Sequence, residues 1–354
     1  MNITVTKTGA PKPKPADDIL GFGQYFTDHM FLMNHDPEKG WHDPRVVPHG
    51  PLPLDPAAMC LHYGQELFEG LKAYRGVDGK LRLFRYRDNI RRFNRSCARL
   101  DVPLIDEALF RDALLTLLRT ETDWTPRSAD ASLYIRPYLI ATDPFLGVRS
   151  SKSYLFILLL SPVGAYYKGG ITPTSIYVET EDVRAVRGGL GSVKAAANYA
   201  ATLRAQTRAG AGGFAQVMWL DALERTYVEE IGTSNAFFVI DGTVLTPALN
   251  DSVLPGITRD SCLCLLREWG VPAEERPVSI DEVYSAYADG KLEECFATGT
   301  AAVVSPVGQL CYAGQSITIA GGGVGPIAGK LYDSLTGIQW GRIPDTRGWT
   351  EVYA

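Results

Sequence analysis

The sequence predicts a mixed α and β protein, of α+β and α/β class, that folds as two domains. Its 354 residues are long for one hydrophobic core and suit two domains of roughly 150 to 200 residues. The first half combines candidate antiparallel strands with two helices, as α+β domains do. A stretch with glycines near the middle indicates a linker. We therefore expect an N-terminal domain at 1–165, with 1–18 as a loose arm, a linker at 166–172 and a C-terminal domain at 173–354.

Hydrophobic spacing places the elements of the first domain. Ile90, Phe93 and Cys97 have helical spacing, whereas 154–160 is a continuous apolar run of strand length. The expected elements are, in order, a strand at 21–34, an extended proline-rich loop at 41–56, a helical turn running into a strand at 61–75, its return strand at 80–84, helices at 87–100 and 105–119, and strands at 132–140 and 154–160.

Turn and capping residues place the elements of the second domain. Asp241-Gly242 is typical of a hairpin turn, and Pro255 starts a helix that Gly270 ends. The expected elements are a strand at 176–179, a helix at 198–209, a hairpin of 215–220 with 225–231, a second hairpin of 236–240 with 243–246, helices at 255–269 and 279–287, and a strand with a tight turn through 292–304.

Composition and charge exclude several classes of function. A net charge of −5 argues against a nucleic-acid surface, which is usually basic. No apolar run approaches the roughly 20 residues of a membrane helix, and the N-terminus lacks the apolar core of a signal peptide. We therefore expect a cytoplasmic protein that binds neither nucleic acid nor membranes.

The placement of histidine and cysteine narrows the chemistry further. All five histidines precede residue 63, and the six cysteines include no Cys-x-x-Cys pair. This excludes a Ser-His or Cys-His mechanism or a histidine-rich metal site housed in the second half, and we expect no metal. Lysine, carboxylates and tyrosines must carry any chemistry there.

Lys194 stands out because its neighbours are small, with glycines before it at 188–191 and alanines after it. Bulky side chains would block the approach of a lysine amine to a flat cofactor, and small ones would not. The alternative is an exposed lysine at the junction of a glycine loop and an alanine-rich helix.

Two turns further along the chain could bind an anion. Pro255-Gly-Ile-Thr258 opens a helix, where unpaired backbone N–H groups and the helix dipole favour negative charge. Simple helix capping is the alternative. Gly299-Thr-Ala301 forms a second tight turn whose N–H groups could face an anion, with an ordinary hairpin turn as the alternative.

Glu229 and Glu230 are adjacent acids at the end of an expected strand. Strand alternation predicts that one carboxylate faces inward and the other outward. An inward carboxylate needs a cation or a protonated ring nitrogen as its partner. Two solvated acids are the alternative.

Taken together, these parts are those that a pyridoxal phosphate site requires: a reactive lysine, an anion-binding helix start and an inward carboxylate. Their order resembles the fold-type IV aminotransferases, most closely the branched-chain amino acid aminotransferases. The motifs that carry this resemblance, from Phe22 to about Gly341, are Phe26-Thr-Asp-His-Met30, Leu67-Phe-Glu-Gly70, Leu133-Tyr-Ile-Arg-Pro137, Gly191-Ser-Val-Lys194 followed by Asn198-Tyr199, Glu230-Ile-Gly-Thr-Ser-Asn235, Leu254-Pro-Gly-Ile257 and Gly299-Thr300.

The resemblance implies a fold-type IV architecture with a small N-terminal α+β domain and a larger C-terminal pseudo-barrel domain, and pyridoxal 5'-phosphate as cofactor. It implies that Lys194 forms the Schiff base, that Tyr199 meets the ring hydroxyl and that Glu230 meets the ring nitrogen. The residues it implies around the phosphate are Arg92, Ile257, Thr258 and Thr300, with Arg184 assisting.

The resemblance also implies which residues bind the substrate. Tyr63 and the Thr300–Ala301 backbone would bind the α-carboxylate, and Arg136 the distal carboxylate of glutamate. The other pocket residues it implies are Phe22, Phe68, Tyr134, Val148, Tyr166 and Thr233. In this family Tyr63 and Val148 reach in from the partner subunit, which implies a homodimer.

The implied reaction is a ping-pong transfer of the amino group between L-leucine, L-isoleucine or L-valine and 2-oxoglutarate, giving branched-chain 2-oxo acids and L-glutamate. An apolar pocket discriminates by only about 1 to 3 kcal/mol per methylene, so we expect all three amino acids to react. One alternative is a D-amino-acid transaminase or aminodeoxychorismate lyase of the same fold, which the long N-terminal region disfavours. The other is a non-catalytic anion-binding oligomer, which the intact Lys194, Tyr199 and Glu230 disfavour.

Overall fold

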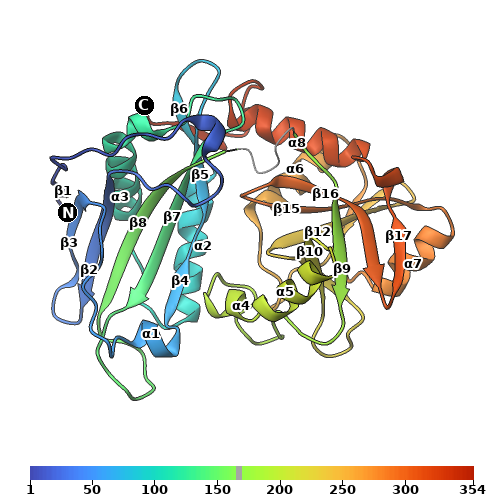
Figure 1. Ribbon diagram of the computed structural model, residues 1–354, viewed down its shortest axis with the longest axis horizontal. Coiled ribbons are helices and arrows are strands. Elements are labelled where there is room, and N and C mark those ends of the chain that lie inside the picture. The colour runs from blue at the N-terminus through green and yellow to red at the C-terminus, as the bar shows by residue number, and fades with distance from the viewer. Residues whose placement is uncertain (165–169) are drawn as a thin grey trace. The chain divides into compact units, whose positions relative to one another are not determined.

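The computed structural model describes residues 1–164 and 170–354, which form two compact units (Figure 1). The first unit contains residues 1–164, Lys194–Ala196 and Gly337–Ala354, and the second contains residues 170–193 and Ala197–Thr336. Residues 165–169, which include Tyr166 and the first part of the expected linker at 166–172, lie outside the described residues.

The first unit is built on a nine-stranded sheet in the order β1-β3-β2-β8-β7-β5-β6-β18, with β4 paired to β7. The pairs are antiparallel except for β1 with β3. The strands are β1 (Thr4–Val5), β2 (His29–Asp36), β3 (Gly40–Pro48), β4 (Glu66–Phe68), β5 (Leu71–Arg75), β6 (Leu81–Phe84), β7 (Ser132–Ala141), β8 (Tyr154–Val163) and β18 (Thr350–Val352). Short helical segments are Asp17–Ile19, α1 (Met59–Tyr63) and Thr122–Trp124.

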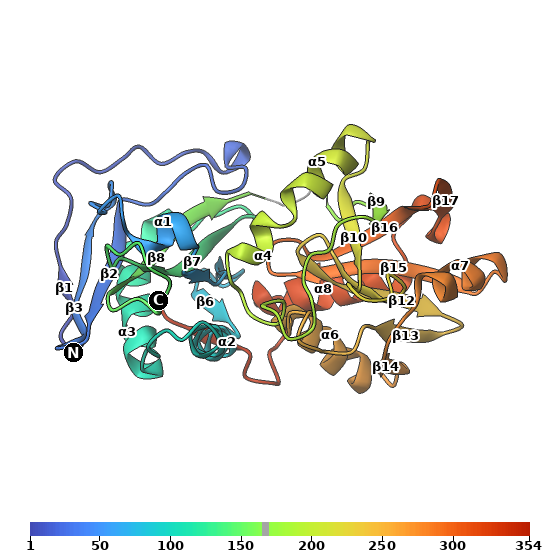
Figure 2. The same cartoon turned by 90° about the horizontal axis from the view of Figure 1, so that it is seen from below.

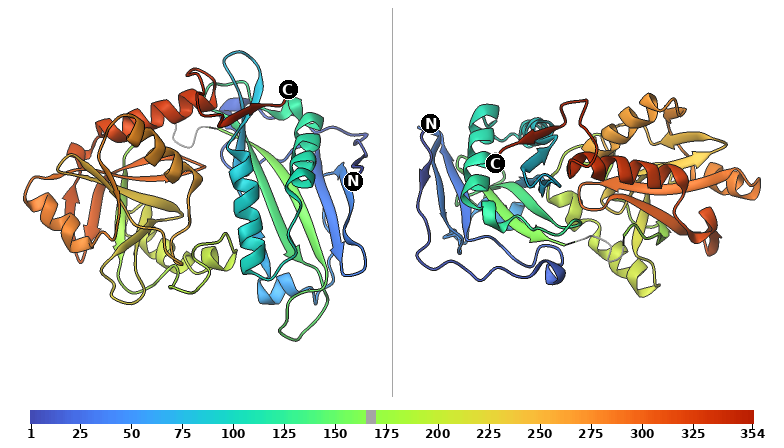
Figure 3. Two further views of the ribbon diagram at one scale, coloured as in Figure 1. Left: turned by 180° about the vertical axis from the view of Figure 1, so that it is seen from behind. Right: turned by 90° about the horizontal axis from the view of Figure 1, so that it is seen from above.

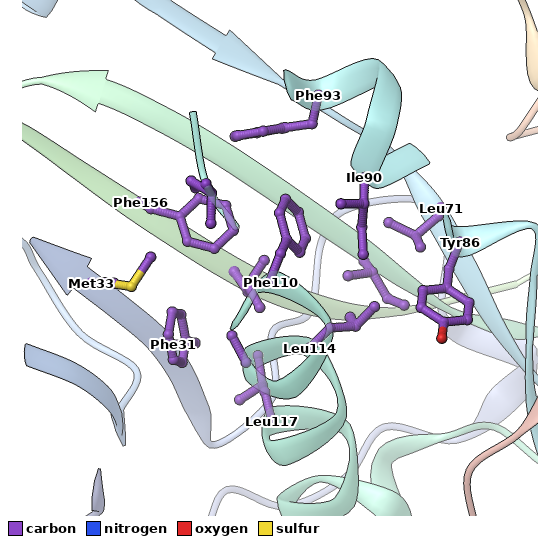
Figure 4. Packing of buried hydrophobic residues seen from close by; sticks show 14 of the residues in the cluster. Phe31, Met33, Leu71, Tyr86, Ile90, Phe93, Phe110, Leu114, Leu117 and Phe156 are labelled. Atoms are coloured by element: carbon purple, nitrogen blue, oxygen red, sulfur yellow. The ribbon is translucent and has the colours of Figure 1, made fainter. Parts of the chain in front are cut away.

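Helices α2 (Tyr86–Arg99) and α3 (Glu107–Thr120) lie on one face of this sheet (Figure 3, left). Phe110, Leu114 and Leu117 of α3 point toward Phe31 and Phe156 of the sheet (Figure 4). The rings of Phe110 and Phe156 are 4.8 Å apart between centroids. This apolar layer follows from the helical spacing of the two segments, so both expected helices and the α+β class of the first unit are confirmed.

The second unit is built on a closed ring of strands. Strands β9, β10, β11, β12, β15 and β16 pair in sequence around the ring, and β11 closes it because it pairs with both β10 and β12. The strands of this unit are β9 (Thr174–Glu179), β10 (Gln216–Leu220), β11 (Val228–Ile231), β12 (Ser234–Ile240), β13 (Thr243–Thr246), β14 (Ala273–Glu275), β15 (Leu292–Gly299), β16 (Val303–Tyr312) and β17 (Gln315–Thr318). The ring confirms the expected pseudo-barrel, because its closure buries an apolar interior without leaving open edges.

Helices lie around these strands (Figure 2). They are α4 (Ala197–Ala200), α5 (Leu203–Ala211), α6 (Ile257–Glu268), α7 (Ile280–Ala288) and α8 (Pro326–Gln339), with a short 3₁₀ turn at Ala320–Gly322. The expected helix at 198–209 is interrupted, because the Thr202 hydroxyl donates to the Tyr199 carbonyl at 2.7 Å and competes with the helical hydrogen bonds. None of the helices in the two described ranges is long and apolar enough to cross a membrane.

The expected loop at 41–56 is wrong in its first half, which forms β3. Two residues of β3, Asp43 and Pro44, lie opposite the single residue Met33 of β2, which is a β-bulge. Asp43 has a φ of 52°. A bulge is one of the few places where a strand accepts proline, so the proline content did not prevent strand formation.

The N-terminal arm is bound to the first unit, so the expectation of a loose arm is wrong. β1 pairs with β3, the backbone N–H of Thr8 donates to His29 Nε2 at 2.8 Å, and that of Lys12 donates to Asp28 at 2.8 Å. These contacts join residues that are far apart in the sequence, so no local sequence pattern predicts them.

The C-terminal residues differ from expectation as well. Sequence placed all of 173–354 in the second domain, yet β18 pairs with β6 and extends the first sheet. The Glu351 carboxylate accepts hydrogen bonds from Tyr86, Arg87 and Arg111, which fixes β18 to α2 and α3.

Candidate active site

A small pocket lies within the second unit. Four residues selected from the sequence line it together: Arg184, Tyr199, Glu230 and Thr233. The other lining residues are Gly191, Val193, Asn198, Thr202 and Leu254. Val193 immediately precedes Lys194 in the chain.

Glu230 supplies a buried negative charge in this pocket. Its carboxylate accepts a hydrogen bond from the Leu254 backbone N–H at 2.8 Å, and Arg184 Nε lies 3.4 Å from its other oxygen. The side chains of both ions are at most 6% exposed. A carboxylate buried in this way is stabilised by positive charge, and a protonated nitrogen is a partner of that kind.

Strand alternation did not hold for the two neighbouring acids: both Glu229 and Glu230 are buried. Trp219 of β10 pairs with Glu230 and Leu220 pairs with Val228, so Glu229 is the extra residue of a β-bulge. All four residues of β11 are buried, so both faces of the strand are covered and neither acid is solvated.

The segment before Lys194 is held by close backbone packing. A Cβ on Gly191 would lie 2.3 Å from the carbonyl oxygen of Ser252, so no larger residue fits there without movement. Asn198 Nδ2 donates to the carbonyls of Leu190 and Val193 at 2.7 and 2.9 Å. Gly191, one of the small residues before Lys194, is therefore required by the close approach of the Ser252 backbone.

The two expected anion-binding turns are present in the second unit. Helix α6 begins after Gly256 with no side-chain cap, and Thr258 in its first turn is buried. A Cβ on Gly256 would lie 1.9 Å from Asn235 Oδ1, which explains the glycine there. Thr300 and Ala301 lie in the tight turn between β15 and β16, and they are half-buried. Neither turn is among the residues that line the pocket around Glu230.

Lys194 itself packs with the first unit, beside β4. Its backbone N–H donates to Ser96 Oγ at 3.1 Å, and its carbonyl accepts from the Phe68 N–H at 3.0 Å. Its Nζ lies 5.1 Å from the centroid of the Phe68 ring. The next residue, Ala195, forms a β-bridge with Leu67. The Leu67-Phe-Glu-Gly motif thus forms the wall beside the lysine.

Four residues expected in the substrate pocket meet one another in the first unit. The rings of Phe22 and Tyr134 are 5.0 Å apart, and Arg136 lies over the rings of Phe68 and Tyr134 at 4.7 and 5.3 Å. A Cβ on Gly70 would lie 2.0 Å from the Tyr134 hydroxyl, so the glycine of the motif makes room for this tyrosine.

Arg92 is buried in α2 and forms a two-pronged ion pair with Glu69. Its Nε and Nη2 lie 2.6 and 2.9 Å from the two Glu69 oxygens. Burial disfavours ionisation of Glu69, but the charge and hydrogen bonds of Arg92, together with the charge of Lys194 and a hydrogen bond from Asn89, outweigh burial and lower the pKa of Glu69. Glu69 follows β4 and Arg92 lies 23 residues later in α2, so no local sequence pattern predicts their ion pair.

Tyr63 and Val148 are on the surface of the first unit. Tyr63, at the end of α1, donates its hydroxyl to the Leu146 carbonyl, and Val148 is 83% exposed. The loop between β7 and β8 carries Val148. It is held against the start of α1, because the backbone N–H of Phe145 donates to the Ala57 carbonyl at 3.2 Å and that of Met59 donates to the Asp143 carbonyl at 3.1 Å. Tyr166, the remaining residue expected in the pocket, lies outside the described residues.

Comparison with known proteins adds an independent observation. Residues 66–310 match the model of the amino-transferase class IV family. The chain belongs to this family. It is 52% identical over 354 residues to branched-chain-amino-acid aminotransferase 2 of Bacillus subtilis (strain 168), covering 100% of this chain and 98% of that protein. It is 48% identical over 334 residues to the branched-chain-amino-acid aminotransferase of Mycolicibacterium smegmatis (strain ATCC 700084 / mc(2)155), covering 93% and 91%.

The architecture agrees with this family. The crystal structure of the Escherichia coli branched-chain amino acid aminotransferase superposes with a TM-score of 0.78 at 25% identity, covering 92% of this chain and 99% of that chain. The protein is thus an aminotransferase of fold type IV, and its cofactor is pyridoxal 5'-phosphate.

The residues of the second-unit pocket fit this cofactor. A buried carboxylate, Glu230, can pair with a protonated pyridine nitrogen, and Tyr199 provides a phenol in the same pocket. Outside the pocket lining, three residues after Leu254, the start of α6 offers backbone N–H groups of the kind that bind phosphate. When bound, the cofactor supplies an electron sink that lets an amino group move between two carbon skeletons.

Proposed function

We propose that this class IV aminotransferase transfers the amino group between L-leucine, L-isoleucine or L-valine and 2-oxoglutarate, in two half-reactions that share one site. The observation that carries the proposal is the similarity over almost the full length to proteins named branched-chain aminotransferases. In the ping-pong order, the branched-chain 2-oxo acid is released first. 2-Oxoglutarate then binds, and it is released as L-glutamate.

We propose that Lys194 anchors the cofactor and then carries a proton at its Nζ to and from the substrate Cα. Tyr199 would bind the ring hydroxyl, and Glu230 the ring nitrogen. The position of Tyr199 and Glu230 in one pocket supports the last two roles. The residues proposed to bind the phosphate are Arg92, Ile257, Thr258 and Thr300, with Arg184 assisting.

The aromatic cluster of the first unit supports an apolar side-chain pocket. Phe22, Phe68 and Tyr134 present carbon surface, while the guanidinium of Arg136 among them suits the distal carboxylate of glutamate. One pocket could therefore accept both an aliphatic side chain and a carboxylate. Thr233 and Ala301 complete the proposed substrate contacts.

We also propose that the enzyme is a homodimer in which Tyr63 and Val148 complete the partner's site. Large apolar residues gather on α1 and the loop that α1 holds: Leu61, Tyr63, Phe145, Leu146 and Val148. Contiguous exposed apolar residues of this kind mark interaction surfaces. A cytoplasmic location is proposed as well, and it agrees with the six cysteines, none of which forms a disulfide in the described part of the chain.

Amino-transfer assays test the function. Purified enzyme with 2-oxoglutarate should form glutamate from leucine, isoleucine and valine, and Lys194→Ala should abolish both this activity and the yellow colour of the bound cofactor. Lys72→Ala would not serve as control because Lys72 is buried, so Lys80→Ala, an exposed lysine of the same unit, is the matched variant. Activity with D-alanine but not with leucine would instead favour a D-amino-acid transaminase.

A further inference from the structure

Glu229 is a buried acid that does not line the cofactor pocket, although its neighbour Glu230 does. Its Oε1 lies within hydrogen-bonding distance of Ser252 Oγ, and its Oε2 has no hydrogen-bond partner among the described residues. A buried polar atom without a partner is costly, so the position of this acid calls for an explanation.

The contacts of Glu229 lead back to Glu230 through two routes. Ser252, which Glu229 holds, accepts a hydrogen bond from Arg184 Nη2 at its carbonyl oxygen, and Arg184 Nε lies 3.4 Å from Glu230. Two residues beyond Ser252, the Leu254 N–H donates to Glu230 at 2.8 Å. Glu229 and Glu230 are also neighbours in the chain. Glu229, Ser252, Arg184 and Glu230 are therefore linked in a ring of contacts that includes the backbone from Ser252 to Leu254.

The segment that carries Ser252 also has supports of its own, because the Asp251 carbonyl accepts from the Ser192 N–H at 2.9 Å and the Leu254 carbonyl accepts from Asn235 Nδ2 at 2.9 Å. Asn250 Oδ1 accepts from the backbone N–H groups of Ser252 and Val253 at 2.8 and 2.9 Å, which makes a local turn. The Ser252 hydroxyl also lies 2.8 Å from the same Asn250 oxygen. The Ser252 hydroxyl has one proton, so it can donate to only one of Glu229 Oε1 and Asn250 Oδ1. Asn250 Oδ1 is an amide oxygen and cannot donate, so both contacts are hydrogen bonds only when Glu229 is the donor to Ser252.

A protonated Glu229 satisfies this arrangement. Burial raises the pKa of Glu229, and the negative charge of Glu230 adds to the effect, although Ser252 and Arg184 oppose it. A neutral Glu229 would donate to Ser252 Oγ, which would in turn donate to Asn250 Oδ1. This chain of two hydrogen bonds fixes the direction of the Ser252 side chain.

We infer that Glu229 is a positioning residue: through Ser252 it holds the 250–254 segment so that Arg184 and the Leu254 N–H aim the Glu230 carboxylate at the ring nitrogen of the cofactor. The inference rests on the proposed role of Glu230. It predicts that Glu229 matters for recognition of that nitrogen, and not for the rest of the cofactor.

The test compares two ligands of the apoprotein, pyridoxal 5'-phosphate and its 1-deaza analogue, in which a C–H replaces the ring nitrogen. Dissociation constants are measured by absorbance and fluorescence titration on the full chain, so the readout does not depend on catalysis. Wild-type protein should prefer the natural cofactor. Glu229→Leu, which keeps the volume but loses the hydrogen bond, should reduce that preference about tenfold, the scale of one lost supporting contact to a buried charge.

Glu229→Gln should keep the preference within about twofold, because its amide can donate to Ser252 Oγ as the neutral acid does. The matched control is Glu294→Leu. Glu294 is equally buried in the second unit, but it accepts from Ile327 and Ala328 at the start of α8 and does not line the pocket. Glu294→Leu should lower the stability of the apoprotein without changing the ratio of the two dissociation constants.

The outcomes separate this inference from the proposed function. If Glu230→Gln keeps the full preference for the natural cofactor, the role of Glu230 is wrong and the inference falls with it. If Glu230→Gln loses the preference while Glu229→Leu keeps it, only the inference about Glu229 is overturned. Should Glu229→Leu fail to fold, Ser252→Ala decides, because it removes the same hydrogen bond from a small side chain: a reduced preference supports the inference and an unchanged one overturns it.

Discussion

Replacing Glu351 by glutamine should weaken the attachment of the C-terminal strand in a pH-dependent way. One Glu351 oxygen accepts from Tyr86 Oη and Arg87 Nη2 at 2.7 and 2.6 Å, and the other accepts from Arg111 Nη2 at 2.8 Å. Burial opposes ionisation of this carboxyl, but the hydrogen bonds from Tyr86 and the two arginines outweigh burial and lower its pKa from 4.5 to about 2.

The size of the effect follows from that shift. A fall of about 2.5 pKa units corresponds to roughly 3.4 kcal/mol at ~1.36 kcal/mol per unit, and the partial exposure of the cluster reduces this to about 1 to 2 kcal/mol after solvent screening. The side chain of Glu351 is 25% exposed and that of Arg87 is 59% exposed. Because the pKa is lower in the folded state, this stability is fully present above pH 4.5 and is lost as the pH falls toward 2.

Urea unfolding of the apoprotein, followed at several pH values, measures the difference between wild type and Glu351→Gln. We expect the variant to be about 1 to 2 kcal/mol less stable at pH 7, with the difference shrinking below pH 4.5. Hydrogen exchange should show faster exchange in β18 and little change in the ring of the second unit. A difference that stays constant from pH 7 to pH 3, or no difference at all, would refute the reasoning.

Three further changes test the site and the core. Glu69→Gln removes the charge that fixes Arg92, so it should weaken binding of pyridoxal 5'-phosphate about tenfold relative to pyridoxal, which lacks the phosphate; Arg92→Ala shows whether that contrast depends on Arg92. Phe110→Ala opens a cavity in the first core and should cost about 3 to 5 kcal/mol in urea unfolding, whereas no loss would show that Phe110 does not pack as described. Gly191→Ala places a methyl group 2.3 Å from the Ser252 carbonyl, and equilibrium titration should show weaker cofactor binding; unchanged affinity would mean that the loop has room to shift.

Local patterns predicted the helices and hairpins of this protein well. Helical spacing predicted 87–100 and 105–119, and the structure has α2 at Tyr86–Arg99 and α3 at Glu107–Thr120. The hairpin turned at Asp241-Gly242 is also confirmed. Each of these depends on residues within one or two turns of chain, where side-chain periodicity and turn chemistry decide the conformation.

Pairings between distant residues were not predictable in the same way. β18 pairs with β6 across more than half of the chain, and the N-terminal arm binds through His29 and Asp28. The ring of the second unit was expected only through the resemblance to fold-type IV enzymes, because alternation within a strand does not say which strand lies beside it. In the candidate site, the small neighbours of Lys194 made it a candidate from sequence, whereas the ion pair of Glu69 with Arg92 joins two segments that no local pattern connects.

The two adjacent acids show how burial on both faces of a strand changes the chemistry of a site. Alternation was expected to expose one of Glu229 and Glu230, but all four residues of β11 are buried, and a bulge lies at Glu229. Two ionised carboxylates next to each other would repel, and burial would strengthen that repulsion. Because Glu229 faces Ser252 and its pKa is raised, while Glu230 has Arg184 within ion-pair distance, the pair can divide into a neutral support and a charged acceptor. Under the proposed role of Glu230, its negative charge is then the one that a protonated ring nitrogen meets, and Glu229 could not replace it without moving away from Ser252.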